Sequence, residues 1–202
     1  VTSTELLDIE SVPPTLAIVG AGVIGMEFAS AFNTFGSKVD VYEFLPECLP
    51  AIDKDIARRL RKSLEKRGVK FHMKYSVGNV DDLGADVVLI ATGRAANTDG
   101  LALEKAGISY DRKGITVDDN MLTNVAGVYA VGDVNGRSML AHAAEWQGRR
   151  AVNHIIGEHD DIRFDIMPSA IFTYPEAACV GPAESELKEK GVEYAVHKSF
   201  YR

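Results

Sequence analysis

The sequence has 202 residues, of which 46% are hydrophobic, and 22 basic against 29 acidic residues give a net charge of −7 at pH 7. Such a chain can bury a core of its own, and its composition fits a soluble α/β protein of one or two domains. No basic run is interleaved with aromatic residues, which argues against nucleic acid as a partner, and no apolar run is long enough to span a membrane.

The cysteines and histidines show no spacing typical of a metal site. Cys48 and Cys179 lie 131 positions apart and form no Cys-x-x-Cys pair, and the five histidines have no ligand spacing. We therefore expect no metal. The spacing neither requires nor rules out a disulfide.

The chain opens with an acidic lead-in, residues 1–14, which ends in Pro13-Pro14. This pair stops a helix and leads an extended chain into the next strand.

Residues 16–25 read Leu-Ala-Ile-Val-Gly-Ala-Gly-Val-Ile-Gly, which predicts a strand, a glycine turn and the start of a helix. Gly20 permits a tight turn, Gly22 lets the backbone approach a pyrophosphate, and Gly25 lets the helix pack closely on the sheet. Free N–H groups at the start of the helix bind phosphate. We therefore expect a dinucleotide to contact this stretch, namely Ile18, Val19, Gly20, Ala21, Gly22, Val23, Ile24 and Gly25.

An acidic residue closes this unit. The apolar pattern of residues 24–35 has the helical period, Gly36 ends the helix, and residues 39–43 form the next strand. Glu43 lies 18 residues beyond Gly25, where its carboxylate can accept hydrogen bonds from both ribose hydroxyls of the adenosine half. No arginine follows to neutralise a 2′-phosphate, so we predict NAD rather than NADP. An ordinary βαβ crossover without a ligand is the alternative on these residues alone.

Further parallel strands and a helix follow. Residues 53–67 form an amphipathic helix with basic side chains in its later turns, and residues 69–75 a third strand. A turn-rich link, 78–84, leads into the continuous apolar strand 85–91.

A second strand-to-helix unit lies beyond two short strands near Ser109 and at 115–117. Residues 127–131 are predicted as a strand, Asp133 stands at its C-terminal turn, and a helix runs from Met139 to Gly157. Ligands of open α/β sheets bind outside strand C-termini, which makes Asp133 a candidate binding residue. A turn or cap residue is the equally open alternative.

The two units, in this order, resemble the pyridine nucleotide-disulfide oxidoreductases, flavoproteins that pass electrons between NAD(P)H, FAD and a thiol or disulfide. The resemblance covers nearly the whole chain through five segments: Ser3–Leu7, Gly20–Glu43, Ala91–Arg94, Thr123–Asp133 and Pro168–Glu176. The last of these, together with Met-Leu-Ala-His at 139–142, is most similar to the dihydrolipoamide dehydrogenase branch.

The resemblance implies an α/β fold in four parts. These are a lead-in from the FAD domain at 1–14, a Rossmann-like NAD-binding domain at 15–95, the later part of an FAD-binding domain at 96–163, and the start of an α+β interface or dimerisation domain at 164–202. Between Val77 and Ala85 the family has a β-meander, for which seven residues leave no room. Either this member is shortened there or a stretch is absent from the sequence.

The resemblance also implies roles for individual residues. For NAD, Glu27 faces the nicotinamide, and Val77 and Gly93 give backbone contacts. Without the family, Glu27 is simply a favourable acid in a first helical turn. For FAD, Asp133 bonds the ribityl chain, and the ring is lined by Met139, Leu140, Ala141 and His142. Taken alone, that histidine is a surface residue.

The implied reaction is dihydrolipoamide plus NAD giving lipoamide plus NADH, through FAD and a redox disulfide. The implied parent is a homodimer that serves a 2-oxo acid dehydrogenase complex in the cytoplasm, or in the mitochondrial matrix of a eukaryote. The family's Cys-x4-Cys and His-Glu pair have no counterpart here, so we expect no catalytic residue in this chain and no activity from it alone. The alternatives are a glutathione, mercuric or related reductase, or a non-catalytic NAD-binding module.

Overall fold

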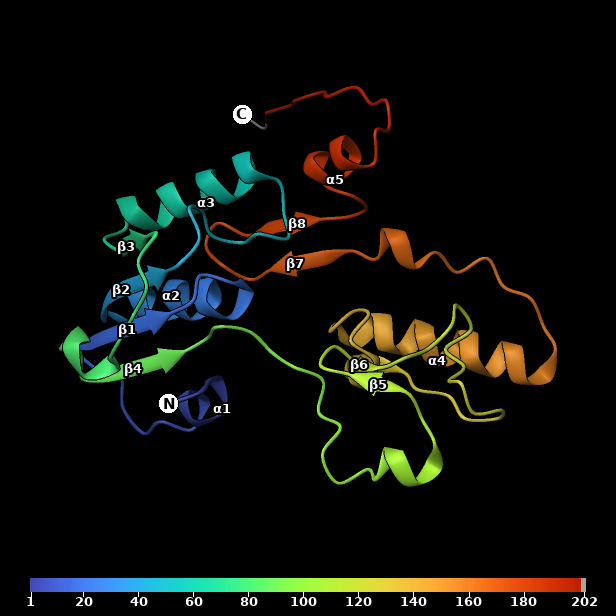
Figure 1. The fold of residues 1–202 in the computed structure, drawn as a ribbon. Coiled ribbons are helices and arrows are strands. Elements are labelled where there is room, and N and C mark those ends of the chain that lie inside the picture. Colours follow the sequence, from blue (N-terminus) through green and yellow to red (C-terminus); the bar gives the residue numbers. More distant parts are fainter. Residues whose placement is uncertain (201–202) are drawn as a thin grey trace. The chain divides into compact units, whose positions relative to one another are not determined.

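The computed structural model describes residues 1–200 and divides into two compact units (Figure 1). One unit contains residues 1–93 and the segment from 168 onward, and the other contains residues 94–167. The four-part domain division expected from the sequence remains a prediction.

The first unit is built on a parallel sheet in the order β3-β2-β1-β4. Its strands and the two helices that connect them are β1 (Thr15–Val19), α2 (Val23–Phe35), β2 (Lys38–Glu43), α3 (Lys54–Lys66), β3 (Lys70–Met73) and β4 (Val87–Ile90). Each strand was predicted, and for β3 and β4 the predicted ends lie one to two residues beyond the observed ends. The expected α/β, Rossmann-like fold is confirmed.

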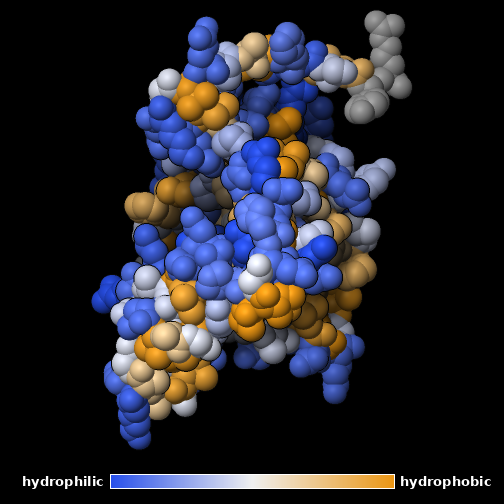
Figure 2. All heavy atoms as spheres, turned by 90° about the vertical axis from the view of Figure 1, so that its right-hand side faces the viewer, coloured by the Kyte–Doolittle hydropathy of each residue, from blue (hydrophilic) through white to orange (hydrophobic). Residues whose placement is uncertain are grey.

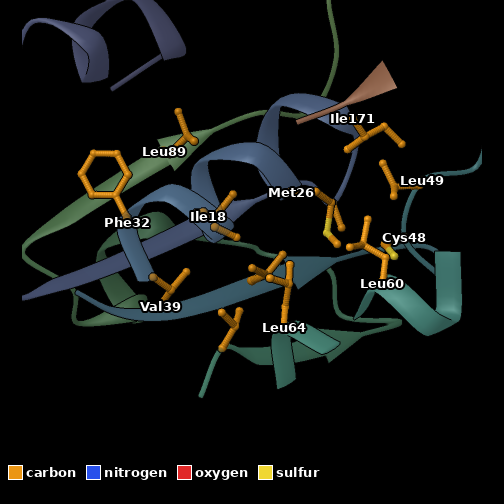
Figure 3. Packing of buried hydrophobic residues seen from close by; sticks show 14 of the residues in the cluster. Ile18, Met26, Phe32, Val39, Cys48, Leu49, Leu60, Leu64, Leu89 and Ile171 are labelled. Atoms are coloured by element: carbon orange, nitrogen blue, oxygen red, sulfur yellow. The ribbon is translucent and has the colours of Figure 1, made fainter. Parts of the chain in front are cut away.

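The main core lies between one face of this sheet and both helices. Ile18 pairs in register with Val41 on one side and with Leu89 on the other, so the three side chains share a face. They are fully buried in one cluster with Met26 of α2 and Leu64 of α3 (Figure 3). β1 lies between β2 and β4 and packs against α2, so neighbours on three sides fix its place in the sheet.

The opposite face of the sheet carries polar and aromatic groups. Asp40, Tyr42 and His72 point there, and Tyr42 pairs directly with His72 across β2 and β3. The β3-to-β4 connection is short and holds only a 3₁₀ turn, Val80–Leu83, which lies in the predicted turn-rich link.

Two further segments pack on the first unit. The lead-in contains a short helix, α1 (Ser3–Leu7), which sequence patterning missed and whose Leu6 is buried in the main core. Beyond residue 168, strands β7 (Ser169–Ile171) and β8 (Ala177–Cys179) form an antiparallel hairpin, followed by helix α5 (Glu184–Glu189).

The second unit has a small core and little regular structure. It contains β5 (Tyr110–Asp111), β6 (Gly114–Ile115) and helix α4 (Ala141–Ile156). The core joins Leu103, Ile115 and Ala130.

The strand predicted at 127–131 was wrong. These residues form only an isolated bridge between Tyr129 and Leu122, because Met121, with φ +66°, takes the partner segment out of the extended conformation. The helix predicted from Met139 begins two residues later, at Ala141, and Leu140 is its N-cap. No helix in the part of the chain that is described is long and apolar enough to cross a membrane.

Candidate functional site

A cavity of about 560 Å³ opens at the carboxyl ends of β1, β2 and β4. This is the edge of an open parallel sheet at which ligands bind. Six of the residues predicted from the sequence to contact NAD line it: Val19, Gly20, Gly22, Glu43, Val77 and Gly93.

The three glycines of the turn have different reasons to lack a side chain. Gly20 has φ +107°, and a Cβ there would lie 2.4 Å from the carbonyl oxygen of Ala91. A Cβ on Gly25 would lie 2.0 Å from the carbonyl oxygen of Gly20. A Cβ on Gly22 would meet nothing within 4 Å. Packing therefore requires glycine at positions 20 and 25, whereas the space beside Gly22 is open for a ligand.

Gly22 is also the N-cap of α2, a helix of 13 residues, and supplies no side-chain cap. The first N–H groups of a helix have no partner within it, and the helix dipole makes this end positive. The start of α2 can therefore receive an anionic group such as a pyrophosphate.

Glu43 is 9% exposed, at the end of β2. Its Oε2 accepts a hydrogen bond from the backbone N–H of Ala21, and its Oε1 accepts one from the N–H of Leu45, both at 2.7 Å. An ionised carboxylate has about four acceptor positions, so each oxygen can accept one more hydrogen bond. The carboxylate is thus fixed beside the glycine turn and can still bind two hydroxyl groups.

Not every predicted residue offers its side chain to the cavity. Ile18 and Ala21 are fully buried in the core, so only their backbone can reach a ligand. Val23 is 38% exposed and Ile24 is half-buried at the start of α2.

Glu27 is outside the set of residues that line the cavity. Its Oε1 accepts a hydrogen bond from the N–H of Phe172 at 2.8 Å, and one turn later the hydroxyl of Ser30 accepts one from the N–H of Tyr174 at 2.9 Å. The carboxylate predicted to face the nicotinamide is therefore engaged with the segment that follows β7.

Sequence reasoning missed two tyrosines of the cavity. Tyr42 and Tyr75 line it together with Phe44, and the two tyrosine ring centroids are 5.3 Å apart. Burial, together with the nearby Asp40 and Tyr75, raises the pKa of Tyr42 above its usual value. The signal was available in the alternation along β2, which puts residues 40 and 42 on the face opposite the core.

In the second unit, Asp133 and the residues predicted to contact FAD lie at or near the surface. Asp133 belongs to a 3₁₀ turn, Gly132–Asn135, and is exposed, as are Met139, Ala141 and His142, while Leu140 is half-buried.

A buried glutamine, also missed from the sequence, holds this turn in place. Gln147 of α4 is 1% exposed, and its Oε1 accepts hydrogen bonds from the N–H of Gly132 at 2.7 Å and from Nδ2 of Asn135 at 2.8 Å. Helix α4 thereby fixes the position of Asp133.

Both cysteines are free thiols. Burial of Cys48 raises the pKa of its thiol to about 12, so it is protonated at neutral pH. Within residues 1–200 no group of three or more acidic, histidine or cysteine side chains is arranged to hold a metal ion.

Comparison with known proteins agrees with this arrangement. The model of the pyridine nucleotide-disulphide oxidoreductase family matches residues 1–148. A mitochondrial dihydrolipoyl dehydrogenase of Arabidopsis thaliana is 41% identical over 98% of the chain and 43% of its own length. The dihydrolipoyl dehydrogenase of Chlamydia muridarum is 37% identical over 99% of the chain and 46% of its own length.

Solved structures give the same result. LpdA from Mycobacterium tuberculosis is similar with a TM-score of 0.84 and 32% identity, over 95% of this chain and 45% of that one. The flavoprotein disulfide reductase RclA of Escherichia coli, as its Cu(II) complex, has a TM-score of 0.82 and 30% identity, over 94% of this chain and 48% of that one. The chain thus spans less than half the length of these relatives.

Proposed function

This chain belongs to the pyridine nucleotide-disulphide oxidoreductase family, and from that premise we propose that it is the NAD-binding segment of a dihydrolipoyl dehydrogenase. The parent would convert dihydrolipoamide and NAD to lipoamide and NADH with FAD as a second cofactor. The observation that carries the proposal is the cavity at the carboxyl end of the sheet, where Gly22 and Glu43 lie together.

The residues of the cavity fit NAD. The open space at Gly22 and the start of α2 would take the pyrophosphate, and the free acceptor positions of Glu43 would take the adenosine ribose hydroxyls. When bound, NAD supplies the hydride acceptor of the reaction. The contribution of this chain is to bind and orient it.

The same carboxylate favours NAD over NADP. A 2′-phosphate would bring negative charge against the buried Glu43, and the next residues that line the cavity, Phe44 and Leu45, carry no positive charge. A charge placed against an unmatched site lowers affinity, here by at least ~1–3 kcal/mol.

The second unit would contribute part of an FAD site. Asp133 would bind the ribityl chain, and Met139 to His142 would lie along the flavin. All of them except Leu140 are exposed, which suits residues that a large cofactor covers.

The partners follow from the same proposal. Dihydrolipoamide on a 2-oxo acid dehydrogenase complex would be the substrate, and the parent would be a homodimer in the cytoplasm or the mitochondrial matrix. Apolar side chains beyond residue 168 are well exposed, with Phe172 at 74% and Val180 at 64%, which supports burial against a partner layer. Hydrophobic groups are also scattered over the face drawn in Figure 2.

A different disulfide substrate is the second candidate, and the similarity to RclA favours it. The test has two steps. The chain itself should bind NADH more tightly than NADPH in a fluorescence titration, without oxidising dihydrolipoamide. The parent protein, at the full length of these relatives, should oxidise dihydrolipoamide faster than it reduces glutathione or mercuric ion. Equal affinity for the two nucleotides would contradict the NAD site, and a preference for another substrate would contradict only the assignment to the dihydrolipoyl branch.

A further inference from the structure

The loop that follows β2 contains a backbone conformation that L-amino acids rarely adopt. Leu49 has φ +50°, in the left-handed region, although it is not a glycine. Its side chain is fully buried, and the next residue, Pro50, lines the cavity. Such a conformation costs free energy and persists where the surrounding structure enforces it, which is common at functional sites.

The backbone of Leu49 contacts the glycine turn. Its N–H donates a hydrogen bond to the carbonyl oxygen of Ala21, at 2.9 Å. Ala21 stands between Gly20 and Gly22, and its own N–H donates to Glu43. Both peptide groups of Ala21 are therefore held, one by the acid at the end of β2 and the other by the loop that follows this strand.

The bond from Leu49 also sets the direction of the N–H of Gly22. The carbonyl of Ala21 and the N–H of Gly22 belong to one trans peptide group, which is planar, so the two point in opposite directions. Because the carbonyl points toward the N–H of Leu49, the N–H of Gly22 points away from it. Gly22 lines the cavity, and the space beside it is open.

The side chain of Leu49 is anchored in the main core. It belongs to the same buried cluster as Met26 of α2 and Ile171 of β7, and the three lie together in Figure 3. The carbonyl oxygen of Leu49 accepts a hydrogen bond from the N–H of Ile52 at 3.2 Å. The core therefore enforces the left-handed conformation, and one of its contacts comes from the hairpin that follows the second unit.

We propose that Leu49 is a positioning residue of the nucleotide site, which directs the N–H of Gly22 toward the pyrophosphate through its bond to Ala21. This rests on the proposed NAD-binding function. Burial of the leucine side chain fixes the backbone of Leu49, and this backbone holds the Ala21–Gly22 peptide group. Ile171 is outside the set of residues that line the cavity, yet through Leu49 it supports nucleotide binding.

Two substitutions at position 49 separate this role from packing alone. The probes are NADH and ADP-ribose, which contains the adenosine and the pyrophosphate but no nicotinamide. Leu49→Ala removes the anchoring side chain and keeps the cost of the left-handed conformation, so it should weaken binding of both probes by about tenfold. Glycine adopts this conformation freely, so Leu49→Gly should weaken binding by no more than about threefold. Packing alone predicts the reverse order, because glycine leaves the larger cavity.

The controls test whether the effect is local. Leu16→Ala is the matched variant, since Leu16 is also a fully buried leucine of the main core but lies near the start of β1, at the opposite end from the cavity. It should lower the stability in urea and leave both affinities unchanged. Ile171→Ala should weaken both by about threefold, because Leu49 loses a neighbour. Adenosine, which has no pyrophosphate, should bind the folded variants as it binds the unchanged chain.

NMR of the unchanged chain covers the case in which a variant does not fold. The amide proton of Leu49 should exchange slowly with solvent, and the amide of Gly22 should shift when ADP-ribose binds. Fast exchange at Leu49 or an unshifted Gly22 amide would overturn the proposal. The same holds for a folded Leu49→Ala chain with unchanged affinity, or a Leu49→Gly chain that binds no better than Leu49→Ala. Each of these results would leave the NAD site standing. If the unchanged chain binds neither NADH nor ADP-ribose, the proposed function fails with it.

Discussion

The carboxylate of Glu43 accepts a hydrogen bond from the backbone N–H of Ala21 at 2.7 Å. The acid at the end of β2 therefore fixes the glycine turn at the end of β1, in addition to any contact with a ribose. Its other oxygen accepts from the N–H of Leu45, so a single side chain satisfies two backbone groups at the mouth of the cavity.

Replacing Glu43 with glutamine should reduce both stability and nucleotide discrimination. The glutamine amide presents an NH₂ group where one oxygen was, and one backbone N–H loses its acceptor, which costs about 1–3 kcal/mol. Removal of the negative charge should narrow the preference for NADH over NADPH.

Urea unfolding and paired fluorescence titrations measure the two effects. Glu189→Gln, an exposed acid in α5, is the control and should change neither. A Glu43→Gln chain that keeps the full discrimination would show that this carboxylate does not face the ribose.

The glycines offer a pair of variants with opposite outcomes. Gly25→Ala places a Cβ 2.0 Å from the carbonyl oxygen of Gly20, within a buried helix–sheet contact, and should destabilise the first unit by about 1–3 kcal/mol or more. Gly22→Ala meets nothing within 4 Å and should fold normally, yet weaken NADH binding by at least tenfold because the methyl group takes up space next to the pyrophosphate.

Thermal unfolding and NADH titration of both variants check this. A Gly22→Ala chain with unchanged affinity would place the pyrophosphate elsewhere.

The turn motif could be predicted from the sequence because the spacing of its three glycines between a strand and a helix is itself the signal, although the contact of Gly20 with Ala91 is distant in sequence. The fold class followed in the same way from the periodicity of the strands and helices. The strand expected at 127–131 shows where such patterns fail, because an apolar run forms a strand only if a partner segment stays extended beside it. Here the partner segment supplies a single bridge to Tyr129.

The residues that sequence reasoning missed owe their roles to contacts between positions that are distant in the sequence. Gln147 is an ordinary polar residue in a helical pattern, and only the approach of the turn at Gly132 makes it a buried acceptor. Likewise, Tyr42 and His72 are 30 positions apart, and their stacking depends on the register of β2 and β3. Glu27 could be assigned to the nicotinamide only by resemblance, and its bond to Phe172 could not be predicted from the sequence.

Gln147 should be among the most sensitive positions of the second unit. Gln147→Leu keeps the volume but leaves the N–H of Gly132 and the amide of Asn135 without this acceptor, at a cost of about 1–3 kcal/mol. Heating monitored by the fluorescence of Trp146, which is adjacent in the helix, reports the loss. Glu145→Gln, on the exposed side of α4, is the control. An equal melting temperature for Gln147→Leu and the unchanged chain would mean that the turn does not depend on this side chain.

Cys48 should make the stability of the first unit depend on pH in alkaline solution. Burial raises the pKa of its thiol from 9.0 to about 12. Between these values the unfolded chain releases a proton that the folded chain retains. The free energy of unfolding therefore falls as the pH rises through this window, with a limiting slope of about 1.4 kcal/mol per pH unit from this group. Below pH 9 the thiol is protonated in both states, and its full contribution to the stability is present.

Urea unfolding at pH 7, 9 and 10 measures the slope. Cys48→Ala should flatten it, whereas Cys179→Ala, which removes the less buried thiol, should leave it as in the unchanged chain. If both variants follow the slope of the unchanged chain, the alkaline destabilisation arises from other groups and Cys48 is not the residue responsible.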